Sequence, residues 1–85
     1  GKNDELLSRE LDACDINLIS VDKIENELRV KAKVRYRQAE QRATVTQPDE
    51  DRLHIVFDEP QRAITRGQAV VLYDGDTVVG GGTIM

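Results

Sequence analysis

The chain has 85 residues, enough for one small domain and not for two. Its net charge of −4 argues against an indiscriminate nucleic-acid binder. One cysteine excludes an intramolecular disulfide, and with one histidine it leaves too few soft ligands for a structural zinc site. No apolar stretch approaches the roughly 20 residues that span a bilayer, and no signal-peptide pattern opens the chain. We therefore expect a soluble, cytoplasmic protein with no membrane partner.

The first 27 residues carry the weakest pattern. Apolar and polar residues alternate over residues 7–11, which predicts a first strand. The apolar residues between positions 16 and 19 are too closely spaced for a strand or helix assignment, so we interpret them as a short turn with apolar plugs.

Residues 28–37 carry the clearest pattern in the chain, because apolar and cationic residues alternate over ten positions. This period of two predicts a strand with one buried and one solvated face. The residues expected to face inward are Leu28, Val30, Ala32, Val34 and Tyr36. Those expected to face outward are Arg29, Lys31, Lys33, Arg35 and Arg37.

Two further strands, over residues 42–47 and 52–58, are predicted to form a hairpin. The segment Pro48–Asp51 between them is polar and begins with proline, which favours a turn. The alternation places five side chains in the core: Ala43, Val45, Leu53, Ile55 and Phe57.

Proline should end the strand at Glu59–Pro60, because it cannot donate to a strand ladder. Residues 61–67 are then expected to form a long loop with one apolar anchor, Ile64. The nearly continuous apolar run over residues 68–73 favours a strand that is covered on both sides.

The end of the chain reads as a second hairpin. Asp74–Gly75 is typical of a two-residue hairpin turn, and the last strand runs from Thr77 to Met85. Three glycines in that strand, Gly80–Gly82, fit a bulge or a sharp corner. Five or six short strands separated by turns favour an all-β fold, a small closed, mainly antiparallel barrel of six strands.

The outward cations of residues 28–37 have two readings. They could form a ridge that contacts RNA phosphates, since five like charges on one face repel one another. They could equally form a solvated face that is balanced by the acidic residues elsewhere, as the net charge suggests. Composition alone leaves these two readings at even odds.

The remaining motifs favour structural readings. Gly80–Gly82 lacks the following helix of a phosphate-binding loop, and the acidic turns at Asp74–Asp76 and Asp49–Asp51 lack the oxygen ligands of a calcium loop. His54 is expected at the surface, and Cys14 as a half-buried residue rather than a nucleophile. We identify no catalytic set and no metal or cofactor ligand, so the chain alone is not expected to be an enzyme.

Four blocks of sequence resemble the C-terminal domain of the tRNA-specific 2-thiouridylases, in this order and spacing. With looser matches at Leu7–Arg9 and Asn17–Ser20, the resemblance extends over nearly the whole chain, and the set is more specific than any one block. The blocks are Lys33–Gln38, Phe57–Thr65, Gly67–Gly75 and Gly80–Ile84.

This resemblance implies that residues 1–85 are one C-terminal domain of a longer enzyme. Enzymes of the family use ATP, with magnesium, and persulfide sulfur from a carrier protein to 2-thiolate the wobble uridine of tRNA. Their ATP loop and catalytic cysteines lie in upstream domains. Their C-terminal barrel is similar to domain 2 of translation elongation factors, and is thought to hold the tRNA near its anticodon arm.

The resemblance favours RNA contact for the cationic strand, mainly with the phosphate backbone. The candidate RNA-binding residues are Arg29, Lys31, Lys33, Arg35, Arg37 and Gln38. A domain that only packs against its neighbours is the alternative. In two places the chain departs from the family: Arg66 stands where proline is common, and Cys14 matches neither catalytic cysteine.

Overall fold

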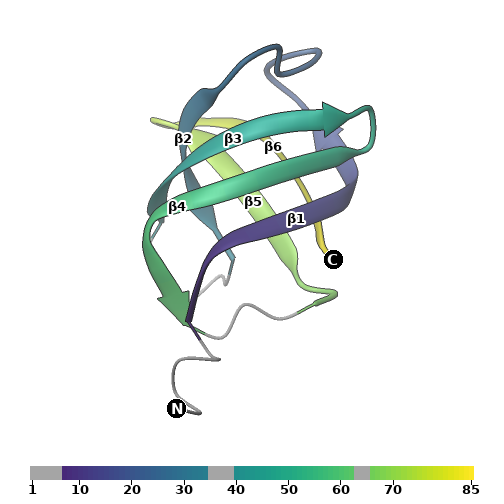
Figure 1. Cartoon of the computed structure of the whole chain (residues 1–85). Coiled ribbons are helices and arrows are strands. Elements are labelled where there is room, and N and C mark those ends of the chain that lie inside the picture. Colours follow the sequence, from purple (N-terminus) through teal and green to yellow (C-terminus); the bar gives the residue numbers. More distant parts are fainter. Residues whose placement is uncertain (1–6, 35–39, 63–65) are drawn as a thin grey trace.

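Six antiparallel strands account for most of the chain in the computed structural model, which describes residues 7–34, 40–62 and 66–85. The strands form a closed ring in the order β1-β4-β3-β2-β5-β6, in which β6 returns to pair with β1. Figure 1 shows β1, β4 and β3 side by side, with β5 and β6 crossing behind them. The strands are β1 Leu7–Leu18, β2 Leu28–Lys33, β3 Gln41–Asp49, β4 Arg52–Arg62, β5 Ala69–Asp74 and β6 Thr77–Ile84.

The ring confirms the predicted closed, six-stranded all-β barrel. Closure matters physically because each strand bonds to two neighbours, which leaves no unpaired strand edge along the barrel. In the described part of the chain, no helix could cross a membrane.

The core is built from the apolar positions that the alternation placed inward. All five predicted core residues of β3 and β4 are buried, and Phe57 is the largest side chain among them, with 1% exposure. Val30 and Ala32 of β2 are buried as predicted, and Leu28 packs partly against the core. The predicted hairpin of β3 and β4 is also confirmed, with Val45 opposite Ile55.

Proline does not end β4 or start the turn before it, so both of those predictions are wrong. Pro60 lies inside β4, which continues to Arg62 and pairs there with Leu7 of β1. The register between β1 and β4 shifts between Ser8 and Glu10, and this irregularity accommodates a residue that lacks an N–H donor. Similarly, Pro48 lies within β3 where its register with β4 shifts, and the turn comprises only residues 50–51.

The apolar residues near position 16 belong to β1, so the predicted turn at this point is wrong. β1 runs on to Leu18 through a register shift between Cys14 and Asn17. Asp15 in this bulge has a φ of 49°, which lets the strand absorb one extra residue relative to β6. Ile16 and Leu18 pack against the core.

Strands β5 and β6 form the predicted second hairpin. Asp74 pairs with Thr77, so its two loop residues are Gly75 and Asp76, one position later than the sequence suggested. Gly75 has a φ of 62°, a conformation that glycine adopts without strain. β5 is not covered on both sides, because burial alternates along it and only its inward residues are buried. Those residues are Val70 and Leu72.

Gly80 of β6 lies at a register shift with β5, which fits the predicted bulge or corner, and the glycines lie close to the backbone of both neighbouring strands. A Cβ atom on Gly81 would lie 2.4 Å from the Val70 carbonyl oxygen of β5. One on Gly80 would lie 2.4 Å from the Asn17 carbonyl oxygen of β1. Any larger residue would therefore push β6 away from both of its neighbours.

Candidate nucleic-acid interface

The outward face of β2 presents cations, as its alternation predicted. Arg29 and Lys31 are exposed and Lys33 is half-buried, while the residues between them are buried. The other candidate RNA-binding residues, Arg35, Arg37 and Gln38, lie outside the described residues, as do Tyr36 and Ile64.

Arg29 is held by an ion pair with a neighbouring strand. Its Nη1 and Nη2 atoms each donate to a different carboxylate oxygen of Asp58 on β4, at 2.7 Å. Nη1 also donates to Thr44 Oγ1 of β3, at 2.8 Å. The Asp58 hydrogen bond and charge raise the pKa of Arg29, so this guanidinium is fixed in both position and charge.

Asp58 lies among arginines from three strands. The hydrogen bond from Arg29 is the main cause of a lowered Asp58 pKa. Burial opposes it, and the charges of Arg29, Arg42 and Arg9 lower the pKa further. Arg9 of β1 also donates from Nε to the Phe57 carbonyl oxygen at 3.4 Å. One carboxylate is therefore shared by side chains from β1, β2 and β3.

Lys31 faces a second cation, because it pairs with Arg42 across β2 and β3. Like charges directly opposite one another on a sheet are destabilising. Both side chains are exposed, and they border a hollow of about 440 Å³ that Asp58, Glu40 and Glu59 also line. We define Arg9, Arg29, Lys31, Lys33 and Arg42 as the cationic surface.

Sequence periodicity could not identify the partners of this surface. Arg42 falls outside the cationic strand, and Asp58 lies 29 residues from Arg29. The alternation of polar and apolar residues in β3 and β4 was one possible signal, because it places Arg42 and Asp58 on the outer surface. Such alternation predicts that both side chains are exposed, but not which residues they contact.

A second polar cluster lies on β1 and β4. His54 Nδ1 is 2.8 Å from Asp12 Oδ1, and its Nε2 is 3.0 Å from Glu10 Oε1. The hydrogen bond to Asp12 is the main cause of a raised His54 pKa, and Glu10 adds to it against the opposing effect of burial. The predicted surface position is confirmed in outline, since the side chain is 35% exposed. The two carboxylates were missed because they lie on another strand.

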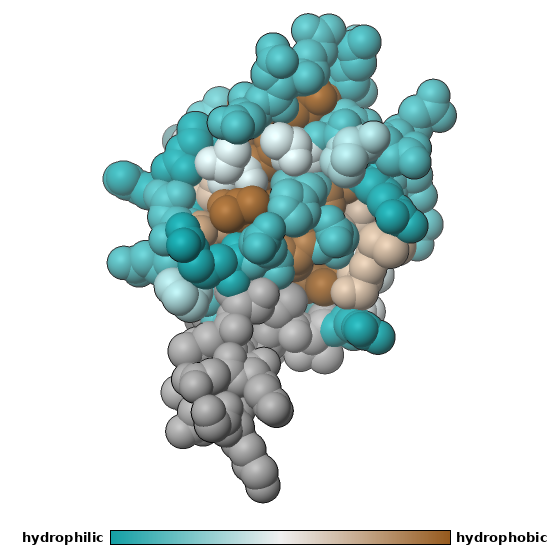
Figure 2. All heavy atoms as spheres, viewed as in Figure 1, coloured by the Kyte–Doolittle hydropathy of each residue, from teal (hydrophilic) through white to brown (hydrophobic). Residues whose placement is uncertain are grey.

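Hydrophilic side chains cover most of the face formed by β1, β4 and β3. Figure 2 shows this face with only scattered apolar atoms. On the same side of the barrel, Asp51 accepts hydrogen bonds from the backbone N–H groups of Asp15 and Ile16, at 3.3 and 3.0 Å. The acidic turn thus supports the bulge of β1, and within the described residues no histidine, cysteine, aspartate or glutamate cluster could hold a metal ion.

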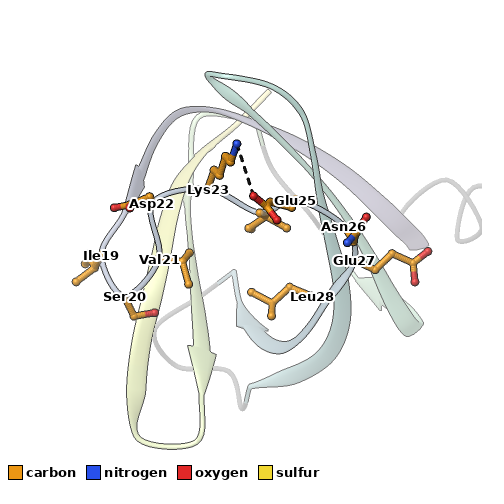
Figure 3. Close-up of a pocket in the computed structure, with 10 residues that line it drawn as sticks. Ile19, Ser20, Val21, Asp22, Lys23, Glu25, Asn26, Glu27 and Leu28 are labelled. Atoms are coloured by element: carbon orange, nitrogen blue, oxygen red, sulfur yellow. Dashed lines mark ion pairs between the residues drawn. The ribbon is translucent and has the colours of Figure 1, made fainter.

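The loop between β1 and β2, residues 19–27, lines an open hollow of about 630 Å³ together with Leu28. Figure 3 shows Lys23 paired with Glu25 on its rim, at 3.6 Å, and Ile19 pointing away from it. Ile24 belongs to this loop and its side chain is buried in the core. Its backbone N–H donates to Gln47 Oε1 at 2.8 Å. The hollow is lined by apolar side chains that pack inward and by charged side chains that are exposed to solvent. Its lining contains no pair of a nucleophile and a base.

Comparison with known proteins assigns the family. Residues 8–84 match the model of the aminomethyltransferase β-barrel domain. The chain belongs to this family. Among tRNA-specific 2-thiouridylases MnmA, it is 56% identical to that of Clostridioides difficile, 52% to that of Acetivibrio thermocellus and 51% to that of Koribacter versatilis. Each alignment covers 99% of this chain and 23% of the relative.

These matches confirm the resemblance to the C-terminal domain of the tRNA-specific 2-thiouridylases. This aminomethyltransferase-type barrel spans about a quarter of the length of the relatives that it matches.

Proposed function

We propose that this barrel is the C-terminal, accessory domain of a tRNA 2-thiolating enzyme, and that its cationic surface contacts the phosphate backbone of tRNA. The proposal extends to the longer protein what the relatives' names state, namely tRNA-specific 2-thiouridylation. ATP and magnesium binding, sulfur delivery by a carrier protein and a cytoplasmic location belong to this proposal for the longer protein.

The observation that carries the RNA proposal is the cross-strand pair of Lys31 and Arg42. The pair costs stability unless an anion lies between or above the two side chains. A phosphate supplies that anion, and it releases counterions from the RNA when it binds. Among the described residues, Lys31 has no ion-pair partner that would compete with RNA.

The neighbouring carboxylates limit how tightly this surface can bind. Asp58, Glu40 and Glu59 lie beside Lys31 and Arg42 around one hollow, and they repel phosphates. A surface of mixed charge suits a domain that orients an RNA held mainly elsewhere, and does not suit a strong independent RNA binder. We therefore expect weak, salt-sensitive binding by the barrel alone.

The test is a pair of charge reversals in the longer protein. Lys31→Glu should weaken tRNA binding several-fold at low salt. It should also make the slope of log affinity against log salt shallower by roughly 0.7–0.9 for each phosphate that the variant no longer neutralises. Affinity is measured by filter binding over a range of salt concentrations, together with ATP binding, which should not change.

The matched control is Lys23→Glu, which makes the same change of charge in the β1–β2 loop, where Lys23 pairs with Glu25. It should leave the salt slope unchanged. Equal slopes for the Lys31→Glu variant and the unmodified protein would exclude direct phosphate contact by Lys31, and would leave domain packing as the main role of the barrel.

A further inference from the structure

A face without charged side chains adjoins the cationic surface at β2 and extends away from it over β5 and β6. In the closed ring, β6 is three strands away from β3 in either direction. Across the 6 residues of β5 and the 8 residues of β6, the one charged residue is Asp74, at the hairpin end. By contrast, three of the 6 residues of β2 are cations.

The strand registers show which side chains form this face. Tyr73 of β5 pairs with Lys31 of β2 on one side and with Val78 of β6 on the other. Two residues away on β5, Val71 pairs with Gly81 of β6, which in turn pairs with Asn17 of β1. The neutral face comprises Val71, Tyr73, Val78, Gly81, Thr83 and Cys14.

The composition of the neutral face is that of a protein contact. Interfaces are depleted of charged residues at their centres and enriched in aromatic residues such as Tyr73. Val78 is 36% exposed, and Ile19 next to β6 is 64% exposed, held there by its N–H bond to the Val79 carbonyl oxygen. Gly81 adds no side chain, so the middle of the face is flat. Because the barrel is closed, a partner must meet such a face and cannot add a strand to an edge.

The size of the neutral face indicates what covers it. Three strands about 4.8 Å apart and six residues at about 3.3 Å each give roughly 300 Å². A stable contact between separate proteins needs about 800 Å² from each partner. Contacts between domains of one polypeptide begin near 600 Å² in total, because the linker supplies a high effective concentration.

We infer that the neutral face docks against another folded domain of the same polypeptide, so that the barrel uses adjoining faces for its neighbour and for RNA. About three quarters of the length of the relatives lies outside the region that matches this chain, which leaves ample sequence for such a domain. This inference rests on the part of the proposed function that places the barrel in a longer enzyme, and it is independent of RNA contact.

Cys14 provides a reporter for the test, because it is half-buried on the neutral face opposite Thr83. In the longer protein, Val78→Lys should raise the alkylation rate of Cys14 at least tenfold, because a buried lysine separates the two surfaces. The rate is followed by mass spectrometry of the peptide that contains Cys14. A rate equal to that of the unmodified protein would overturn the inference.

The control is Val56→Lys, which makes the same substitution at an outward, half-buried valine of β4, two strands away from β6 in the ring. It should leave Cys14 labelling unchanged, and an equal rise in both variants would also overturn the inference. If Val78→Lys does not fold, the near-isosteric Val78→Thr takes its place, with a smaller rise expected. Val78→Thr adds no charge, so it should leave the salt dependence of tRNA binding unchanged, which separates this result from the test at Lys31.

Discussion

Two cations on the same face of β2 differ in what they can bind. Arg29 already donates to Asp58 and Thr44, so a phosphate at this position must compete with a bidentate carboxylate. Lys31, two residues further on, faces Arg42 instead. Exposure of both residues followed from the alternation of the sequence. Their different partners did not, because they come from strands whose position is set only when the barrel closes.

His54 should make stability depend on pH. Its pKa is raised above the ordinary value of 6.5 in the folded protein, mainly by the hydrogen bond with Asp12. The stabilisation is thus fully present below about pH 6.5 and is lost as the pH rises through the folded-state pKa. Since the ring lies at the surface, we expect a change of no more than about 1 kcal/mol in unfolding free energy.

The measurement compares urea denaturation of the unmodified protein and of His54→Gln at pH 5.5 and pH 8.5. The chain has a single histidine, so few other groups titrate in this range. The stability advantage over His54→Gln should shrink at the higher pH. An advantage that stayed constant, or grew, would show that the ion pairs with Asp12 and Glu10 do not form in solution.

Among the strands, those with unbroken alternation were predicted with the correct faces, notably β2 and the hairpin of β3 and β4. The glycines of β6 indicated an irregular position in that strand. One error concerns faces, since β5 was expected to be covered on both sides and is buried on one. The other errors concern where strands end. They arise at Pro48, at Pro60 and in the second half of β1, where register shifts occur. A bulge depends on which distant strand lies alongside, and local propensity does not contain that information.

The tip of the β3–β4 hairpin should stabilise the bulge of β1. Asp51→Ala removes the acceptor for the N–H groups of Asp15 and Ile16, so it should lower the unfolding free energy by about 1 kcal/mol. Chemical denaturation measures this decrease. Glu50→Ala alters the neighbouring turn residue, whose side chain makes neither bond, and should change stability by less than about 0.5 kcal/mol. Equal effects of the two substitutions would mean that the turn acts through charge alone.

For the whole molecule, stability depends on closure of the ring. Deleting residues 77–85 removes β6 and leaves β1 and β5 with unpaired edges beside an opened core. We expect such a chain to be unfolded or aggregated, as measured by circular dichroism and analytical ultracentrifugation. Deleting Met85 alone, whose side chain is 43% exposed, should preserve the barrel. A soluble, β-rich monomer without β6 would show that five strands suffice.

The pairing of β1 with β6 joins the first strand of the barrel to the last one. During synthesis, the growing chain can form the β3–β4 hairpin early, but β1 must wait for its second neighbour until Ile84 has emerged from the ribosome. The barrel therefore cannot complete its core strand by strand as it is translated. Until then, both strands that will flank β6 are open to pairing with other chains, which makes this interval the most aggregation-prone stage in the life of the protein.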